Sequence, residues 1–184
     1  MSETIPHRGM PKIYRLNKPL LVTEKIDGTS ALVYVGADGA VLAGSRNRWL
    51  TPDNDNCGFA AWVAENAAEL ATLGHGYHHG EWWGQGIQRG YGLAGRRFSL
   101  FNARRWSGRQ PACCDVVPWR EVPAERLTLA HDDVAAFAAA WLGAGSVAAP
   151  GYKSPEGIVV CHEVSGACFK YTFGGDGHKG NNNG

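Results

Sequence analysis

The sequence has no long apolar run, no strong excess of one charge and no closely paired cysteine motif. Without an apolar run of about 20 residues, a transmembrane helix is excluded. Residues 1–20 carry charges and prolines where a secretory signal would be apolar, so we expect a cytoplasmic protein with no membrane partner. Because the formal net charge is only +1, a polyanionic partner would have to be held by a local basic patch.

The cysteines and histidines give little support for a metal-stabilised fold. The 5 cysteines are an odd number, and none lies in a Cys-x-x-Cys pair. We therefore expect reduced, mostly buried thiols. The 7 histidines also lack zinc-ligand spacing, because adjacent His78 and His79 on a strand would point to opposite faces.

The length and hydrophobic patterning predict one α+β domain. A chain of 184 residues with 44% hydrophobic residues suits a single globular domain over residues 1–184, with a flexible tail at residues 174–184 rich in glycine and asparagine. Helical spacing is found at 58–73, after the candidate caps Asp55 and Asn56, and at 132–142. Strand patterns are found at 20–27, 31–35, 40–45, 77–83, 97–102, 157–162 and 167–173. This irregular succession predicts mainly antiparallel sheets flanked by helices.

A lysine lies at the end of the first expected strand, followed closely by a carboxylate and a glycine. Lys25 and Asp27 are two residues apart, so on a strand they would share a face, and Gly28 permits a tight turn. Such a lysine is usually a solvated charge. To act as a nucleophile it must be neutral, which costs about 4.6 kcal/mol for an ordinary lysine at pH 7. Nearby positive charge from Arg46, Lys170 or a divalent metal would reduce that cost.

Five further segments follow in a recognisable order. They lie at 44–47, 79–84, 98–102, 155–160 and 169–172. With residues 24–28, this succession resembles the covalent nucleotidyltransferase superfamily of ATP-dependent ligases and mRNA capping enzymes. The stretch at 84–88, Gly-Gln-Gly-Ile-Gln, is most similar to RNA ligases that seal nicks in duplex RNA.

The resemblance implies a fold, an activity and cofactors. The implied fold is a nucleotidyltransferase, ATP-grasp-like ligase domain, with two antiparallel sheets flanked by helices and a central ATP cleft. The implied activity is ATP-dependent RNA ligation in RNA repair, joining 3′-OH and 5′-phosphate ends through a lysyl-AMP intermediate and an adenylylated 5′ end. ATP and Mg²⁺ or Mn²⁺ are the implied cofactors, and the implied partner is RNA with such ends, as in a nicked duplex.

The same resemblance assigns roles to individual residues. Lys25 is the implied nucleophile, Phe101 the aromatic that stacks on adenine, and Lys170 the cation at the α-phosphate. Glu81 and Glu156 are the implied ligands of the ribose and of a divalent metal. The implied ATP-binding set is Glu24, Lys25, Ile26, Asp27, Gly28, Arg46, Glu81, Phe101, Glu156 and Lys170.

The chain departs from the family pattern in three places. Thr172 stands where relatives have a second lysine, and Lys153, Lys179 or Arg89 are candidates to replace its charge. Ser30 stands where many RNA ligases have asparagine. No second domain is expected after this one, so we expect the protein to resemble minimal ligases or to use an accessory partner protein.

Several arginines between residues 89 and 109 predict a local nucleic-acid surface. Together with Arg46, the predicted RNA-binding residues are Arg89, Arg104 and Arg105. A solvated rim would give the same pattern. Two other functions are compatible with the sequence: a DNA ligase or capping-type nucleotidyltransferase, and an RNA-end-binding module that has lost catalysis, which Thr172 would favour.

Overall fold

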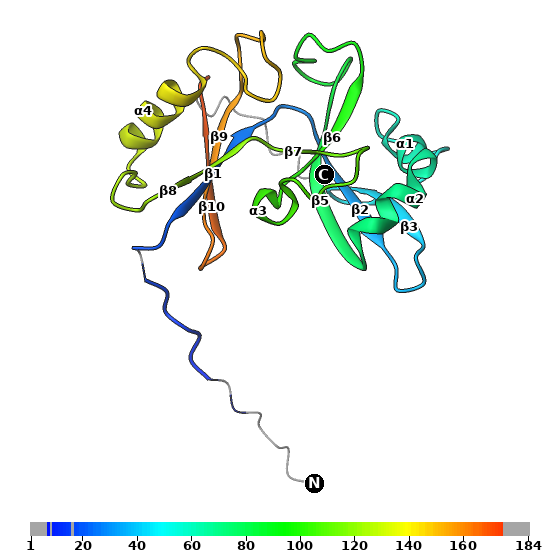
Figure 1. The fold of residues 1–184 in the computed structure, drawn as a ribbon, viewed down its shortest axis with the longest axis horizontal. Coiled ribbons are helices and arrows are strands. Elements are labelled where there is room, and N and C mark those ends of the chain that lie inside the picture. Colours follow the sequence, from blue (N-terminus) through cyan, green and yellow to red (C-terminus); the bar gives the residue numbers. More distant parts are fainter. Residues whose placement is uncertain (1–6, 8, 16, 175–184) are drawn as a thin grey trace, which may run out of the picture.

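Two sheets form the body of the protein (Figure 1). The computed structural model describes residues 7, 9–15 and 17–174, so most of the tail predicted at residues 174–184 lies outside the described residues. One sheet has the strand order β10-β9-β1-β8 and the other β4-β3-β2-β5-β6-β7. All strand pairs are antiparallel except β6 with β7, which confirms the predicted α+β class.

The four-stranded sheet is covered on one face by a single long helix. Its strands are β1 (Leu20–Lys25), β8 (Trp119–Val122), β9 (Gly157–His162) and β10 (Ala167–Thr172). The helix α4 (His131–Leu142) packs against Val22, Ile158 and Val160, which are almost fully buried. Because side chains alternate along a strand, Thr23 and Lys25 point to the opposite face, towards the second sheet.

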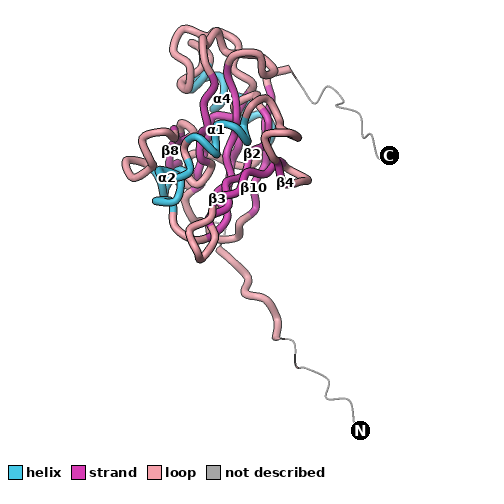
Figure 2. The backbone as a smooth tube through the Cα atoms, turned by 90° about the vertical axis from the view of Figure 1, so that its right-hand side faces the viewer, coloured by secondary structure: helices cyan, strands magenta, loops and turns pink. Residues whose placement is uncertain are grey.

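Short helices cover the outer face of the six-stranded sheet, which faces the viewer in Figure 2. Val33 and Phe98 are fully buried on this side, beneath the helices. The predicted helix at 58–73 is divided at Asn66, and the carboxylate of Asp55 caps its first turn by accepting the N–H of Ala60 at 2.7 Å. The elements are β2 (Thr29–Val35), β3 (Val41–Ser45), β4 (Trp49–Leu50), β5 (Gly76–Gly84), β6 (Arg96–Leu100), β7 (Asp115–Val116), α1 (Phe59–Glu65), α2 (Ala67–Leu70) and a 3-10 turn (Ala71–Leu73).

A small third core joins the two sheets near the end of β1. Ile26, Trp83 and Tyr91 are buried there, together with Ala103 at the start of the short helix α3 (Ala103–Trp106). Figure 1 shows α3 between the sheets. This core fixes the turn after Lys25 against the second sheet, and so determines where the lysine lies.

The prediction that the cysteines are reduced and mostly buried is wrong for three of them. Cys161 and Cys168 form a disulfide, because the register of β9 and β10 places them directly opposite each other with a Cα–Cα distance of 4.1 Å. Cys57 is a free thiol but exposed, whereas Cys114 is free and buried, as expected. Within the described part of the chain, no helix is both long and apolar enough to cross a bilayer.

Candidate active site

Lys25 ends β1 and is paired with a carboxylate from the neighbouring strand. Its Nζ donates a hydrogen bond of 2.6 Å to Oε2 of Glu156, which immediately precedes β9. The register explains this contact, because Lys25 lies opposite Gly157. The Lys25 side chain is 26% exposed and that of Glu156 only 10%, so the ion pair is partly shielded from water but accessible to a ligand.

The turn after Lys25 is held against a second, half-buried carboxylate. The N–H of Gly28 donates to Oε1 of Glu81 at 3.1 Å. A Cβ at Gly28 would lie 2.5 Å from the carbonyl oxygen of Trp82, so this close approach requires glycine. The motif thus brings Lys25 and Glu81 together from strands far apart in sequence.

Glu81 is electrostatically unusual. Burial raises its pKa to about 7, and the nearby carboxylates of Glu156 and Asp27 act in the same direction. The charge of Lys25 and the hydrogen bond from Gly28 oppose the rise. A carboxyl group poised between its two protonation states near neutral pH would gain from a cation bound beside it.

Asp27 lies beyond the end of β1 and is part of a separate network. Its carboxylate accepts a hydrogen bond of 2.9 Å from Nε of Arg89, which also donates to the carbonyl of Ser154 at 3.2 Å. The N–H of Asp27 donates to the Tyr91 hydroxyl at 2.8 Å. Arg89 therefore connects the segment that carries Lys25 with the segment that precedes Glu156. The predicted strand ran to residue 27, but β1 ends at Lys25.

The register places Lys170 on the same face as the catalytic candidate. Gly157 of β9 lies between Lys25 of β1 and Thr172 of β10, opposite both. Lys170 is two residues before Thr172 on β10, so its side chain is on the same face of the sheet as Lys25. With strands about 4.8 Å apart, the backbone of Thr172 is about 10 Å from that of Lys25. The threonine that replaces the family lysine thus occupies the row nearest the nucleophile.

Two predicted ATP-binding residues have side chains that point elsewhere. Glu24 is 1% exposed, and its carboxylate accepts hydrogen bonds from the Ser146 hydroxyl at 2.6 Å and from the N–H groups of Val147 and Ala148, both at 2.9 Å. Ile26 packs in the third core. Both residues position Lys25, and any contact they make with a nucleotide would use backbone atoms.

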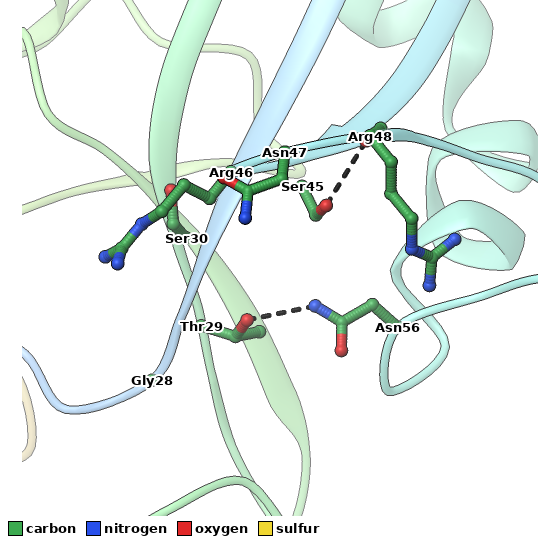
Figure 3. A pocket seen from close by; sticks show the side chains of 8 residues that line it. All are labelled: Gly28, Thr29, Ser30, Ser45, Arg46, Asn47, Arg48 and Asn56. Atoms are coloured by element: carbon green, nitrogen blue, oxygen red, sulfur yellow. Dashed lines mark hydrogen bonds between the residues drawn. The ribbon is translucent and has the colours of Figure 1, made fainter. Parts of the chain in front are cut away.

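Arg46 lines a polar pocket beside Gly28 (Figure 3). In Figure 3 its guanidinium extends past Ser30 and away from Arg48, while Asn56 donates to the Thr29 hydroxyl at 2.9 Å. The pocket has a volume of about 470 Å³. Its lining residues are Gly28, Thr29, Ser30, Ser45, Arg46, Asn47, Arg48 and Asn56.

Phe101 lies just after β6 and is 43% exposed. Its N–H donates to the carbonyl of His79, so Phe101 lies opposite His79 across β5 and β6. Because His79 and Glu81 are two residues apart on β5, Phe101 and Glu81 lie on the same face of the sheet. The ring is therefore accessible, and its stacking on adenine stays a prediction.

The predicted arginine surface is partly neutralised within the protein. Arg104 forms ion pairs with Glu121 and Glu163, the latter at 3.0 Å. The guanidinium of Arg105 lies 4.5 Å from the ring centre of Trp106. Arg104 thus ties α3 to the four-stranded sheet, and its role in RNA binding stays a prediction.

Sequence reasoning missed three residues that shape the site: Tyr91, Ser146 and Asn56. Each contacts the Lys25 region from far away in the sequence. For Tyr91 the sequence holds one signal, because it lies between Gly90 and Gly92. In the structure Tyr91 adopts a positive φ of 53°. Ser146 and Asn56 lie in loops without a comparable pattern.

The protein groups around Lys25 offer only part of a metal site. Glu156 is close enough to Glu81 for its charge to raise the pKa of Glu81. Across the residues that the structure describes, no group of three or more histidine, cysteine or carboxylate side chains could hold a metal ion. Mg²⁺ commonly uses one or two carboxylates together with substrate phosphates, so this donor set suits a metal that arrives with a nucleotide.

The comparisons with known proteins identify the family. The profile of the RNA ligase family matches residues 18–172, and the chain therefore belongs to the RNA ligase family. No curated protein matches the chain.

Solved structures of a Naegleria gruberi RNA ligase share the fold. The E227A mutant with ATP and Mn is 23% identical with a TM-score of 0.65, and the K326A mutant with ATP and Mn is 21% identical with a TM-score of 0.64. The same ligase with PPi is 22% identical with a TM-score of 0.64. In all three, the match covers 85% of this chain and 49% to 50% of the other. The chain thus spans about half the length of these ligases.

Proposed function

We propose that the chain is an ATP-dependent RNA ligase that carries AMP on Lys25. The observation that carries this proposal is the pairing of Lys25 with Glu156, beside Glu81, in a member of the RNA ligase family. The structures of a similar fold that hold ATP, Mn and PPi support a nucleotide in the corresponding place.

In the first step, Lys25 attacks the α-phosphorus of ATP. An N–P bond forms, the P–O bond between the α-phosphorus and the bridging oxygen breaks, and pyrophosphate leaves. Because the ammonium group is paired with Glu156, it must first lose a proton to water and be released from that carboxylate. Arg46 and Lys170 supply positive charge that lowers the cost of deprotonation and balances the phosphates.

Glu81 and Glu156 are the residues that would hold Mg²⁺ or Mn²⁺. A divalent ion bound there would offset the phosphate charge. It would also compete with Lys25 for Glu156. Because Glu81 is buried among like charges, its ionised form would be stabilised by the same cation.

The later steps join two RNA ends. An oxygen of the 5′-phosphate attacks the phosphorus of lysyl-AMP, and Lys25 is released as an amine that takes up a proton from water. The 3′-hydroxyl then attacks the 5′-phosphorus, its proton goes to water and AMP leaves. We propose a nicked RNA duplex as substrate and an accessory protein that helps to hold it.

Replacement of the nucleophile tests the proposal. After incubation with [α-³²P]ATP and Mg²⁺, the unchanged protein should carry label, while Lys25→Ala should carry none. Lys12→Ala is a matched control, because that lysine is exposed and lies before β1, outside both sheets. A labelled Lys25→Ala protein would refute the assignment. Nicked RNA, DNA and hybrid duplexes then separate an RNA ligase from a DNA ligase, and binding of RNA ends without labelling would identify a non-catalytic module.

A further inference from the structure

Three aromatic side chains, Tyr34, Trp49 and Tyr77, form an exposed cluster beyond the candidate active site. Tyr77 is 63% exposed and Trp49 is 50% exposed. The half-buried ring of Tyr34 lies between the other two rings. The ring centres of Tyr34 and Tyr77 are 4.7 Å apart, and those of Tyr34 and Trp49 are 6.0 Å apart. We call these three residues the aromatic face. Exposed aromatic rings gathered in this way are typical of a binding surface.

The aromatic face is continuous with the site of Glu81. Along β5, Glu81, His79 and Tyr77 are alternate residues and therefore share one face of the sheet. Their partners on β2 are Ser30, Leu32 and Tyr34. Same-face positions are about 7 Å apart, so the aromatic face begins about 13 Å from Glu81. A bound strand could therefore reach from the candidate active site to these rings within a few nucleotides.

The charges around the aromatic face suit a polyanion. On this face of strands β2 to β6, as far as the structure describes them, Glu81 is the only carboxylate. The ring of His75 lies 6.1 Å from that of Tyr34, and Arg105 lines a pocket of about 160 Å³ with Tyr77. The guanidinium of Arg105 beside Tyr77 would hold a phosphate while the rings contact bases.

We propose that the aromatic face stacks unpaired bases of an RNA strand whose end lies at Lys25. This inference rests on the ligase activity proposed above and refines its substrate: beyond the end held at Lys25, the strand is unpaired and not part of the duplex. Bases in a duplex are already stacked on each other, whereas unpaired bases present free π faces to aromatic side chains. The proposal therefore assigns a single-stranded segment to this surface.

Binding of a fluorescein-labelled, 5′-phosphorylated single-stranded RNA, measured by anisotropy, tests the proposal. Tyr77→Ala and Trp49→Ala should each weaken binding about tenfold, the range expected for loss of one stacked base. Tyr77→Phe should bind normally, because it keeps the ring. The matched control is Tyr14→Ala, which removes a tyrosine that is 43% exposed outside the sheets. Since no charge is removed, the dependence of affinity on salt should keep its slope.

The outcomes separate this inference from the proposed function. Labelling of Lys25 by ATP should be unchanged in Trp49→Ala, because β4 is separated from β5, which carries Glu81, by β3 and β2. Absence of labelling in all proteins would refute the proposed function, while the RNA affinities would still decide the inference. Unchanged RNA affinity, an equal loss of affinity for fully paired duplex RNA, or a loss of self-association in its place would overturn it.

Discussion

The raised pKa of Glu81 should make the folded protein lose stability as the pH rises. Its pKa is about 7 in the folded protein against 4.5 ordinarily, chiefly because the group is buried. The unfolded chain therefore releases this proton at lower pH than the folded protein does. The stabilising contribution of Glu81 to the free energy of unfolding is fully present below pH 4.5 and is lost as the pH rises through 7.

The size of this loss follows from the two pKa values. At about 1.4 kcal/mol per pH unit, a change from 4.5 to about 7 corresponds to about 3 kcal/mol in the free energy of unfolding. This is a large part of the stability of a typical domain. A divalent metal with ATP should recover much of it at pH 8, because the cation favours the ionised form of Glu81.

Urea unfolding at pH 5 and pH 8 measures the effect. Glu81→Gln keeps the size of the side chain and an acceptor for Gly28, but it cannot ionise. The free energy of unfolding of the unchanged protein should fall by about 2.5 kcal/mol relative to Glu81→Gln between the two pH values, because the unfolded chain is already mostly ionised at Glu81 at pH 5. The exposed Glu125→Gln should show no such change. A difference between the unchanged protein and Glu81→Gln that does not vary with pH would refute the reasoning.

Three other variants test the framework around Lys25. Glu24→Ala should lower the free energy of unfolding by about 3 kcal/mol, since it leaves three donors without their acceptor, among them the buried Ser146 hydroxyl, and urea unfolding would detect this. Gly28→Ala should reduce labelling by ATP at least tenfold, because its Cβ would lie 2.5 Å from the Trp82 carbonyl; normal labelling would contradict that packing. Replacement of both Cys161 and Cys168 by serine should cost about 2 kcal/mol, as expected for a short closed loop, and thermal unfolding with and without reductant checks it.

The elements that were predicted correctly are those with local signals. The strand patterns at 31–35 and 40–45 predicted β2 and β3, and helical spacing at 132–142 predicted α4. The strand β8 was missed because its pairing partner is β1, about 100 residues earlier in the chain. The helix α3 has only four residues, which is too short for a periodic signal.

The site shows the same division between local motifs and distant contacts. The ordered motifs predicted Lys25, Glu81 and Glu156, and the structure brings these three together. The buried position of Glu24 could not be predicted, because its partners lie more than 120 residues later. The engagement of Arg104 with two carboxylates was missed for the same reason, since charge counted along the sequence does not show which groups pair.

The intact mass of the protein after incubation with ATP and Mg²⁺ tests the central claim most directly. We predict that the unchanged protein gains the mass of one AMP moiety, that Lys25→Ala gains none, and that added pyrophosphate removes the adduct. An unchanged protein that never gains this mass, or an adduct that persists in Lys25→Ala, would contradict the assignment of Lys25 as the nucleophile.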